Sequence, residues 1–277
     1  MPVIAMTREM ATRGSEVALG VAERLGLDIV HHEVVEHYIA RRTGLRDSEV
    51  HRFLEGEASM WERWRMDPSR LSRFTALEIL ELAAKGNVLI RGWGASYLLR
   101  AIPSIACVRI CAPLAFREKV LMDRLAIHDE LTARREIERN DAAHTATMQR
   151  MCGISWRYPE HYALVLNTAR VPVQDCVEHI VQLVCSSAYQ ETERSRRELL
   201  DHLVKARVNE AFEQEFGSRS NHYGFEASVH DGHVILRGAT TDSQLIVDAL
   251  RLLQSIDGVR SVENKVSHVE FAPRQAI

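Results

Sequence analysis

Short apolar runs alternate with long segments of helical apolar spacing through the first two thirds of the chain, and this alternation constrains the fold more than any other feature. Five runs are wholly or mostly apolar: 3–6, 27–30, 88–90, 105–111 and 163–166. Such strands are typical of a parallel sheet that is buried on both faces, because half-exposed strands would alternate apolar and polar residues. Strands that alternate with helices therefore predict an α/β domain.

The last third of the chain follows a different pattern. Residues 189–198 are almost entirely polar, and we expect them to link a domain at 1–188 to a second domain at 199–271. The elements expected after the linker are a helix at 199–212, strands at 225–229 and 234–236 around a tight turn, a helix at 242–255 and a strand at 262–269. This αββαβ order predicts a small α+β domain of a size that can fold alone.

Composition and charge exclude several classes of protein. The 277 residues are 46% hydrophobic and 26% charged, as in ordinary globular proteins. The formal net charge of −3 gives no electrostatic basis for general nucleic-acid binding. No apolar run approaches the ~20 residues of a membrane span, and the first residues lack a signal peptide's apolar segment, so we expect a cytoplasmic protein. Five cysteines without a CxxC pair predict reduced thiols, and no spacing of ligand residues predicts a metal site.

Residues 7–15 join the first expected strand to a helix, which is the position of a potential anion site. Unpaired backbone N–H groups and the dipole at a helix N-terminus attract phosphate. The full phosphate-loop pattern GxxxxGK[ST] is absent, because only Gly14 is present and no Lys follows it. From these residues alone, an ordinary strand–loop–helix connection is favoured over a phosphate cradle.

Several collinear blocks resemble the cytidylate-kinase-like family of P-loop proteins over about residues 3–185. The blocks are TRE at 7–9, GSEVA at 14–18, VAERLG at 21–26, GNVLIRGWGA at 86–95, RICAPLAFR at 109–117, REIERNDAAH at 135–144 and YALVLNT at 162–168. The C-terminal segment resembles a BON domain, with D-G-x-V-x-L-x-G at 231–238 and D-G-V-x-x-V-x-N at 257–264.

The first resemblance implies a P-loop NTPase-like sheet with flanking helices and a helical lid, with ATP and Mg²⁺ on the first loop and a nucleoside monophosphate such as CMP as acceptor. The donor-phosphate loop would hold Arg8, Gly14 and Ser15, with Arg13 as a further source of positive charge. The lid would hold Arg117, Arg124, Arg135, Arg139 and Asp141, all but Arg135 being catalytic candidates. The acceptor would lie near Glu33, Arg91, Trp93 and His144. The alternative for the lid residues is a solvated helix face with simple charge pairing.

Three departures from the family pattern put catalysis in question. The glycine-rich GSGG run is Ala11-Thr12-Arg13-Gly14 here, and we expect the first three side chains to crowd the phosphate-binding N–H groups. Trp93 stands between two glycines, where the family has an Arg. Its indole would either stack on a base or pack in the protein. Arg91, two positions earlier, would point to the same side if the strand continues, and could then replace the missing Arg. His144 replaces the Arg of a D-x-x-R signature and is expected to carry a partial charge near neutral pH.

Two hypotheses of function follow. The first is an ATP-dependent nucleoside-monophosphate kinase. The second is a catalytically weak or inactive nucleotide-binding protein that signals through its BON-like domain. That domain implies contact with a protein or a phospholipid, but residues 188–277 carry 11 basic and 14 acidic side chains, so simple attraction to anionic lipid is not expected.

Overall fold

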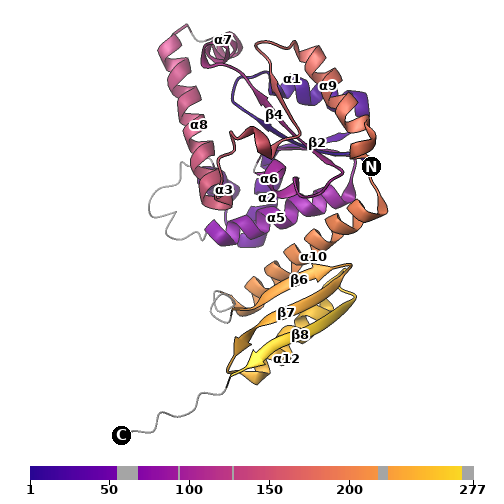
Figure 1. Cartoon of the computed structure of the whole chain (residues 1–277). Coiled ribbons are helices and arrows are strands. Elements are labelled where there is room, and N and C mark those ends of the chain that lie inside the picture. The colour runs from indigo at the N-terminus through magenta and orange to yellow at the C-terminus, as the bar shows by residue number, and fades with distance from the viewer. Residues whose placement is uncertain (55–67, 93, 127, 218–223, 270–277) are drawn as a thin grey trace. The chain divides into compact units, whose positions relative to one another are not determined.

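The computed structural model describes residues 1–54, 68–92, 94–126, 128–217 and 224–269 (Figure 1). Its backbone divides into two compact units, Met1–Ser195 and Arg196–Ile277. No helix in these ranges is both long and apolar enough to cross a lipid bilayer.

The N-terminal unit is built on a five-stranded parallel sheet in the order β2-β3-β1-β4-β5. The strands are β1 (Val3–Arg8), β2 (Asp28–Val30), β3 (Val88–Arg91), β4 (Ile105–Cys111) and β5 (Leu164–Asn167). Each overlaps an expected apolar run and differs from it by at most two residues at either end, and the prediction of a parallel α/β sheet is confirmed. The central strand β1 is buried over its first five residues, which explains its unbroken apolar sequence.

Helices cover both faces of this sheet (Figure 1). They are α1 (Gly14–Leu25), α2 (His32–Thr43), α3 (Asp47–Leu54), α5 (Pro68–Lys85), α6 (Ala95–Leu99), α7 (Leu114–Leu125), α8 (Glu130–Cys152) and α9 (Val173–Cys185), with the short 3-10 helices η1 (Pro159–His161) and η2 (Ser187–Tyr189). The apolar sides of α1 and α9 pack with β1 and β4 into one core. Gly20 allows α1 to approach α9 closely, because a Cβ there would lie 2.7 Å from Val177 Cγ2.

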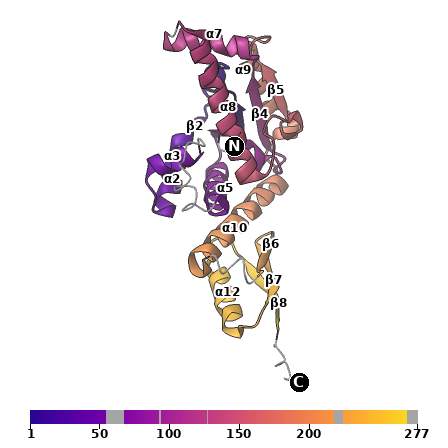
Figure 2. The ribbon, with the colours of Figure 1, turned by 90° about the vertical axis from the view of Figure 1, so that its left-hand side faces the viewer.

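α7 and α8 pack against each other as a helical hairpin, and α8 runs back along the unit to contact α5 (Figure 2). The hairpin starts just after the carboxyl end of β4, and β4 pairs with β1 so that Thr7 is opposite Arg109 and Arg8 opposite Ile110. The carboxyl ends of β1 and β4, the start of α1 and the base of the hairpin therefore meet at one edge of the sheet.

The C-terminal unit has the expected order of elements. It contains the larger part of α10 (Glu193–Phe216), then β6 (Glu226–His230), β7 (His233–Thr240), α12 (Ser243–Ser255) and β8 (Ser261–His268). β6 and β7 are antiparallel, β7 and β8 are parallel, and α10 and α12 pack on the sheet around Val208, Val234 and Leu236. The αββαβ prediction is confirmed.

The expected linker at 189–198 is partly helical, and this is a correction. α10 begins at Glu193 because Thr192 and Ser195 cap it reciprocally: the Thr192 N–H donates to Ser195 Oγ over 2.9 Å, and the Ser195 N–H donates to Thr192 Oγ1 over 3.1 Å. Such mutual capping satisfies N–H groups that a helix start leaves unpaired. The polar composition of residues 189–198 did not reveal this helix, because polar residues are common both in linkers and at the start of a helix.

Candidate functional site

The loop between β1 and α1 has the backbone of an anion site. Ala11 and Arg13 both have φ of 58°, in the left-handed region, and Arg13 is the N-cap of α1. Within the described part of the chain, no oxygen accepts a hydrogen bond from the backbone N–H groups of residues 10–15. Carbonyl oxygens of the same loop are bonded: Thr12 Oγ1 donates to Glu9 O over 2.8 Å, and Thr168 Oγ1 donates to Thr12 O over 2.7 Å.

The side chains at 11–13 each have a partner within the protein, and the expectation that they crowd the N–H groups stays a prediction. Ala11 is buried in a small apolar cluster with three residues of the hairpin: Leu121, Ala133 and Ile137. Thr12 is buried, and its hydroxyl donates to the carbonyl of Glu9. Arg13 pairs with Glu16 over 2.5 Å in the exposed first turn of α1, and this hydrogen bond lowers the pKa of the Glu16 carboxyl.

Gly14 leaves space for the half-buried Arg8 side chain. A Cβ on Gly14 would lie 3.0 Å from Arg8 Cβ and 3.1 Å from Arg8 Cδ, so Arg8 crosses directly over the start of α1. Ser15 follows in the first turn of the helix. Arg8, Arg13, Gly14 and Ser15 thus lie around one loop, and their role in holding the donor phosphates stays a prediction.

Behind the loop lies a group of charged residues that we call the arginine–carboxylate cluster, made of Glu9, Arg109, Arg117, Asp141 and Arg157. Glu9 accepts from Arg109 Nη2 over 2.6 Å and from the Ala112 N–H over 3.2 Å, and Arg117 Nη1 lies 3.7 Å from it. Arg109 and Glu9 are buried. Arg109 Nε is buried without an acceptor among the described residues, and its guanidinium carbon lies 5.3 Å from the centre of the Trp156 ring.

Arg117 and Asp141 form a bidentate ion pair, with Nη1 and Nη2 each 2.8 Å from a carboxylate oxygen. Arg117 Nε also donates to the carbonyl of Met10 in the loop over 2.7 Å. Arg117 is only 3% exposed, so the alternative of a solvated helix face is wrong for this residue. The pair instead ties the base of the hairpin to the loop.

The other arginines of the hairpin lie at its surface. Arg124 is in the last turn of α7, and Arg135 and Arg139 are on α8; all three are exposed. Arg139 pairs with Glu136 over 3.0 Å, three residues earlier on the same helix. For Arg139, local charge pairing holds, as the alternative for the lid residues expected.

His144 is stacked on Trp156, with ring centres 4.3 Å apart and planes 3° from parallel. The pKa of His144 is lowered to about 4, mainly by burial and also by the charges of Arg8, Arg157 and Arg109, while Asp141 acts in the opposite direction. His144 is therefore neutral near pH 7, and the expected partial charge is wrong because the ring is desolvated and surrounded by cations.

The described structure covers only part of the expected acceptor site. β3 ends at Arg91 and Gly92 turns the chain with φ of 85°, so the strand does not continue and the reason for Arg91 to replace residue 93 fails. Glu33 lies in the first turn of α2, and its side chain is outside the described part. Trp93 itself lies outside the described residues.

Four residues at this edge of the sheet were not singled out from the sequence: Glu9, Arg109, Trp156 and Arg157. One signal was available, because Arg109 is a charged residue within the apolar run 105–111, and a buried charge in a strand needs a partner. No comparable signal marks Arg157, which follows α8 in an irregular segment.

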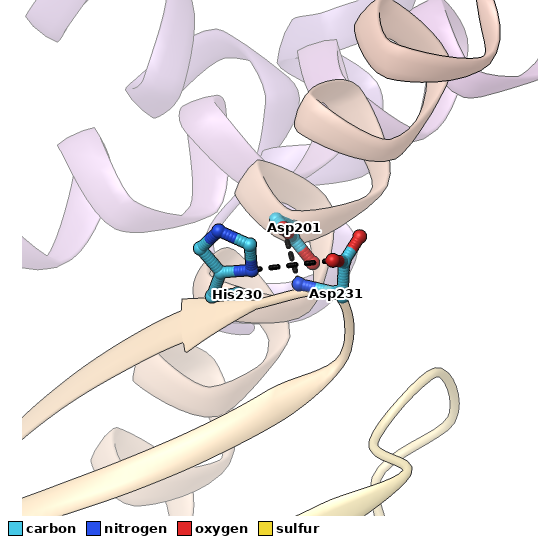
Figure 3. Close-up of side chains that lie close together, drawn as sticks. All are labelled: Asp201, His230 and Asp231. Carbon is cyan, nitrogen blue, oxygen red and sulfur yellow. Dashed lines mark hydrogen bonds and ion pairs between the residues drawn. The ribbon is translucent and has the colours of Figure 1, made fainter.

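The C-terminal unit has a cavity of about 270 Å³ between α10, the β6–β7 turn and the turn before β8. At its rim Asp201, His230 and Asp231 lie close together (Figure 3). The Asp201 carboxylate accepts from the N–H groups of Asp231 and Gly232 over 2.7 and 2.9 Å, and His230 Nδ1 lies 3.4 Å from Asp231. Asp201 therefore caps the turn between β6 and β7.

Comparison with known proteins finds a matching family for each of the two units. Residues 3–170 match the model of the cytidylate kinase-like family, and residues 201–269 match that of the BON domain. The cytidylate kinase of Pyrobaculum aerophilum is 24% identical over 189 residues, which are 68% of this chain and 95% of that protein. An uncharacterized protein from Eubacterium ventriosum has a similar fold, with a TM-score of 0.53 and 18% identity over 67% of this chain and 99% of that one. The chain belongs to the cytidylate kinase-like family and carries a BON domain in its last third.

Proposed function

We propose that this chain binds ATP at the loop after β1 and transfers the γ-phosphoryl group to a nucleoside monophosphate, with CMP as the first acceptor to test. The proposal is carried by the unpaired N–H groups of residues 10–15 at the start of α1. Successive N–H groups in a backbone with left-handed residues form a concavity that binds anions, and the helix dipole adds to the attraction. Membership of the cytidylate kinase-like family supports the same activity.

The residues at the loop fit a nucleoside triphosphate with Mg²⁺. Arg8 and Arg13 supply positive charge beside the N–H groups, and Ser15 offers a hydroxyl oxygen, the hard ligand type that Mg²⁺ prefers. When bound, Mg²⁺ neutralises charge on the transferring phosphate. Because such transfer depends mainly on position and electrostatics, the contribution of this chain is to hold the donor phosphates at fixed N–H groups.

Arg117 and Asp141 support this role as positioning residues, because the three donor nitrogens of Arg117 are bonded to protein oxygens. Their pair fixes Met10 and therefore the adjacent N–H groups. Arg124 and Arg139 are exposed on the hairpin and remain the candidates for contact with phosphate when the lid meets nucleotide. For the acceptor, Glu33, Arg91, Trp93 and His144 remain candidates, with His144 as a neutral hydrogen-bonding group.

The second candidate is a protein that binds nucleotide with little transfer and reports the bound state through its BON domain, to a protein or a phospholipid partner. The ion pair of Arg13 with Glu16 favours it, because a neighbouring carboxylate offsets the positive charge that Arg13 brings to the loop. The neutral state of His144 favours it as well.

Gly14→Asp tests nucleotide binding at the loop. A side chain there collides with Arg8, and its carboxylate repels phosphate at the N–H groups, so we expect ATP affinity in calorimetry to fall more than tenfold. Gly44→Asp is a matched control, because it adds the same charge at a helix end where a Cβ meets no atom within 4 Å. Phosphoryl transfer from ATP to CMP, measured on the same samples, separates the enzyme from the binding protein. Equal ATP affinity in folded Gly14→Asp and the natural chain would refute the proposed site.

A further inference from the structure

The arginine–carboxylate cluster holds more positive than negative charge. Three guanidinium groups, those of Arg109, Arg117 and Arg157, face two carboxylates, those of Glu9 and Asp141. Arg109 is paired with Glu9 and Arg117 with Asp141, and both arginines are buried. The cluster therefore has one positive charge more than it has negative charges, and Arg157 shares its carboxylate, Asp141, with Arg117.

Arg157 is the member of the cluster that is open to a ligand. Its side chain is 50% exposed, against 10% for Arg109 and 4% for Arg117. Nη2 donates to Asp141 over 2.9 Å, while Nε and Nη1 donate to no acceptor among the described residues. A guanidinium group has five N–H donors in a planar fork, a geometry that matches phosphate oxygens.

The structure holds Arg157 in place from three sides. Its carbonyl accepts from Arg109 Nη1 over 2.8 Å, its guanidinium carbon lies 5.5 Å from the centre of the buried Trp156 ring, and Asp141 binds its Nη2. A cation near an aromatic face and an ion pair both reduce the freedom of the side chain. Ordering this guanidinium therefore costs a ligand less than ordering a free surface arginine would.

One carboxylate oxygen connects Arg157 to the loop. Asp141 Oδ2 accepts from Arg117 Nη1 over 2.8 Å and from Arg157 Nη2 over 2.9 Å. Arg117 in turn donates to Met10 O, beside the unpaired N–H groups. Arg157 thus lies one carboxylate away from the arginine that fixes the loop, and His144, stacked on the same Trp156 ring, adds no positive charge near neutral pH.

We propose that Arg157 contacts a phosphate group of the bound nucleotide, so that the loop N–H groups and this guanidinium clamp the phosphates from two sides. This inference rests on the proposed function. The phosphate is either one of ATP or that of the monophosphate acceptor, and the test distinguishes the two.

The test is the affinity of Arg157→Gln for matched pairs of ligands: ATP and adenosine, and CMP and cytidine. Gln keeps a polar side chain but removes the charge. Losing a charged hydrogen-bonding partner costs about 10- to 100-fold in affinity, and we expect this loss for the phosphorylated ligand of one pair only. The pair that shows the loss identifies the phosphate. Affinity for the nucleosides should not change, because they have no phosphate.

Arg24→Gln is the matched control. Arg24 is 51% exposed and pairs with Glu178 over 3.1 Å, but it lies in the last turn of α1, at the opposite end from the loop. We expect it to leave all four affinities unchanged. Arg157→Lys keeps the charge and should lose less than Arg157→Gln, which guards against an effect of misfolding.

The outcomes separate this inference from the proposed function. If the natural chain binds neither ATP nor CMP, the proposed function fails and the inference falls with it. If it binds nucleotide and Arg157→Gln binds ATP and CMP equally well, the proposed function stands and the role of Arg157 is refuted. Equal losses for nucleosides and nucleotides would also refute it, because they would show that Arg157 only maintains the structure.

Discussion

Two tight turns in this molecule require left-handed backbone, and they achieve it in opposite ways. In the β6–β7 hairpin the residues are Asp231 and Gly232, with φ of 49° and 74°, the usual chemistry of a two-residue hairpin turn. In the loop after β1 they are Ala11 and Arg13, both at 58°, although neither is glycine. The left-handed region costs a residue with a side chain roughly 1 kcal/mol or more. The loop must therefore be held by its surroundings, whereas the hairpin turn is encoded locally.

The largest effect is expected when the support of the loop is removed. Arg117→Met leaves Asp141 without its bidentate partner and frees Met10 O, so we expect the free energy of unfolding of the N-terminal unit to fall by about 3–5 kcal/mol. Denaturant unfolding measures the loss. The double variant Arg117→Met, Asp141→Leu should be less destabilised than the single one, because no largely buried carboxylate is then left with the exposed Arg157 as its remaining arginine partner. A single-variant loss below about 1 kcal/mol would mean that the loop holds itself.

The second effect is a dependence on pH that the hairpin turn should not share. The pKa of His144 is about 4 in the folded chain against an ordinary value of 6.5, so the unfolded state binds the proton more readily between these values. The contribution is fully present above pH 6.5 and is lost as the pH falls toward 4, and we expect roughly 2 kcal/mol less stability at pH 5 than at pH 7 from this group.

His144→Phe isolates that contribution, since Phe can stack on Trp156 but does not titrate. The difference in unfolding free energy between pH 7 and pH 5 should be smaller in this variant than in the natural chain. The same difference in both would show that His144 is not desolvated.

The third effect concerns the hairpin turn itself. In Gly232→Ala the new Cβ would lie 2.9 Å from Gly258 O at a φ of 74°, so we expect the C-terminal unit to lose about 1–2 kcal/mol. Hydrogen exchange of the β6 and β7 amides localises the loss. Gly217→Ala, where no atom lies within 4 Å of an added Cβ, carries the backbone cost without the collision and should be milder. Equal losses would show that the close approach to Gly258 does not matter.

The smallest effect is expected at Ala11, the residue of the loop after β1 that packs with helices α7 and α8. Ala11→Gly removes the backbone strain of a left-handed residue. It also removes a methyl group buried among Leu121, Ala133 and Ile137, at a cost of about 0.8 kcal/mol. In addition, glycine raises the conformational entropy of the unfolded chain, which lowers stability. The terms nearly cancel, and we expect a change within about 1 kcal/mol in thermal unfolding. A clear gain in stability would mean that the strain at Ala11 outweighs its packing.

The sequence predicted the secondary-structure elements well, but it did not predict which strands or charged residues are neighbours in the fold. The apolar runs identified all five parallel strands and the DG turn identified the hairpin, because both signals are local. The strand order was not predictable, since continuous apolar runs do not encode which strand is the neighbour. The pairs Glu9–Arg109 and Arg117–Asp141 join residues far apart in the sequence, and only the fold brings them together. The helix start at Glu193 was missed because Thr192 and Ser195 read equally well as linker residues.

The burial of Ala11 also limits how such a chain can change over generations. Its methyl group fills a space bounded by Leu121 on α7 and by Ala133 and Ile137 on α8. A change to glycine opens that space, and a larger side chain at any of the three helical positions presses on the loop after β1. Substitutions at these four positions should therefore occur together, and among related sequences the residue at position 11 should covary with helical positions that lie far from it along the chain.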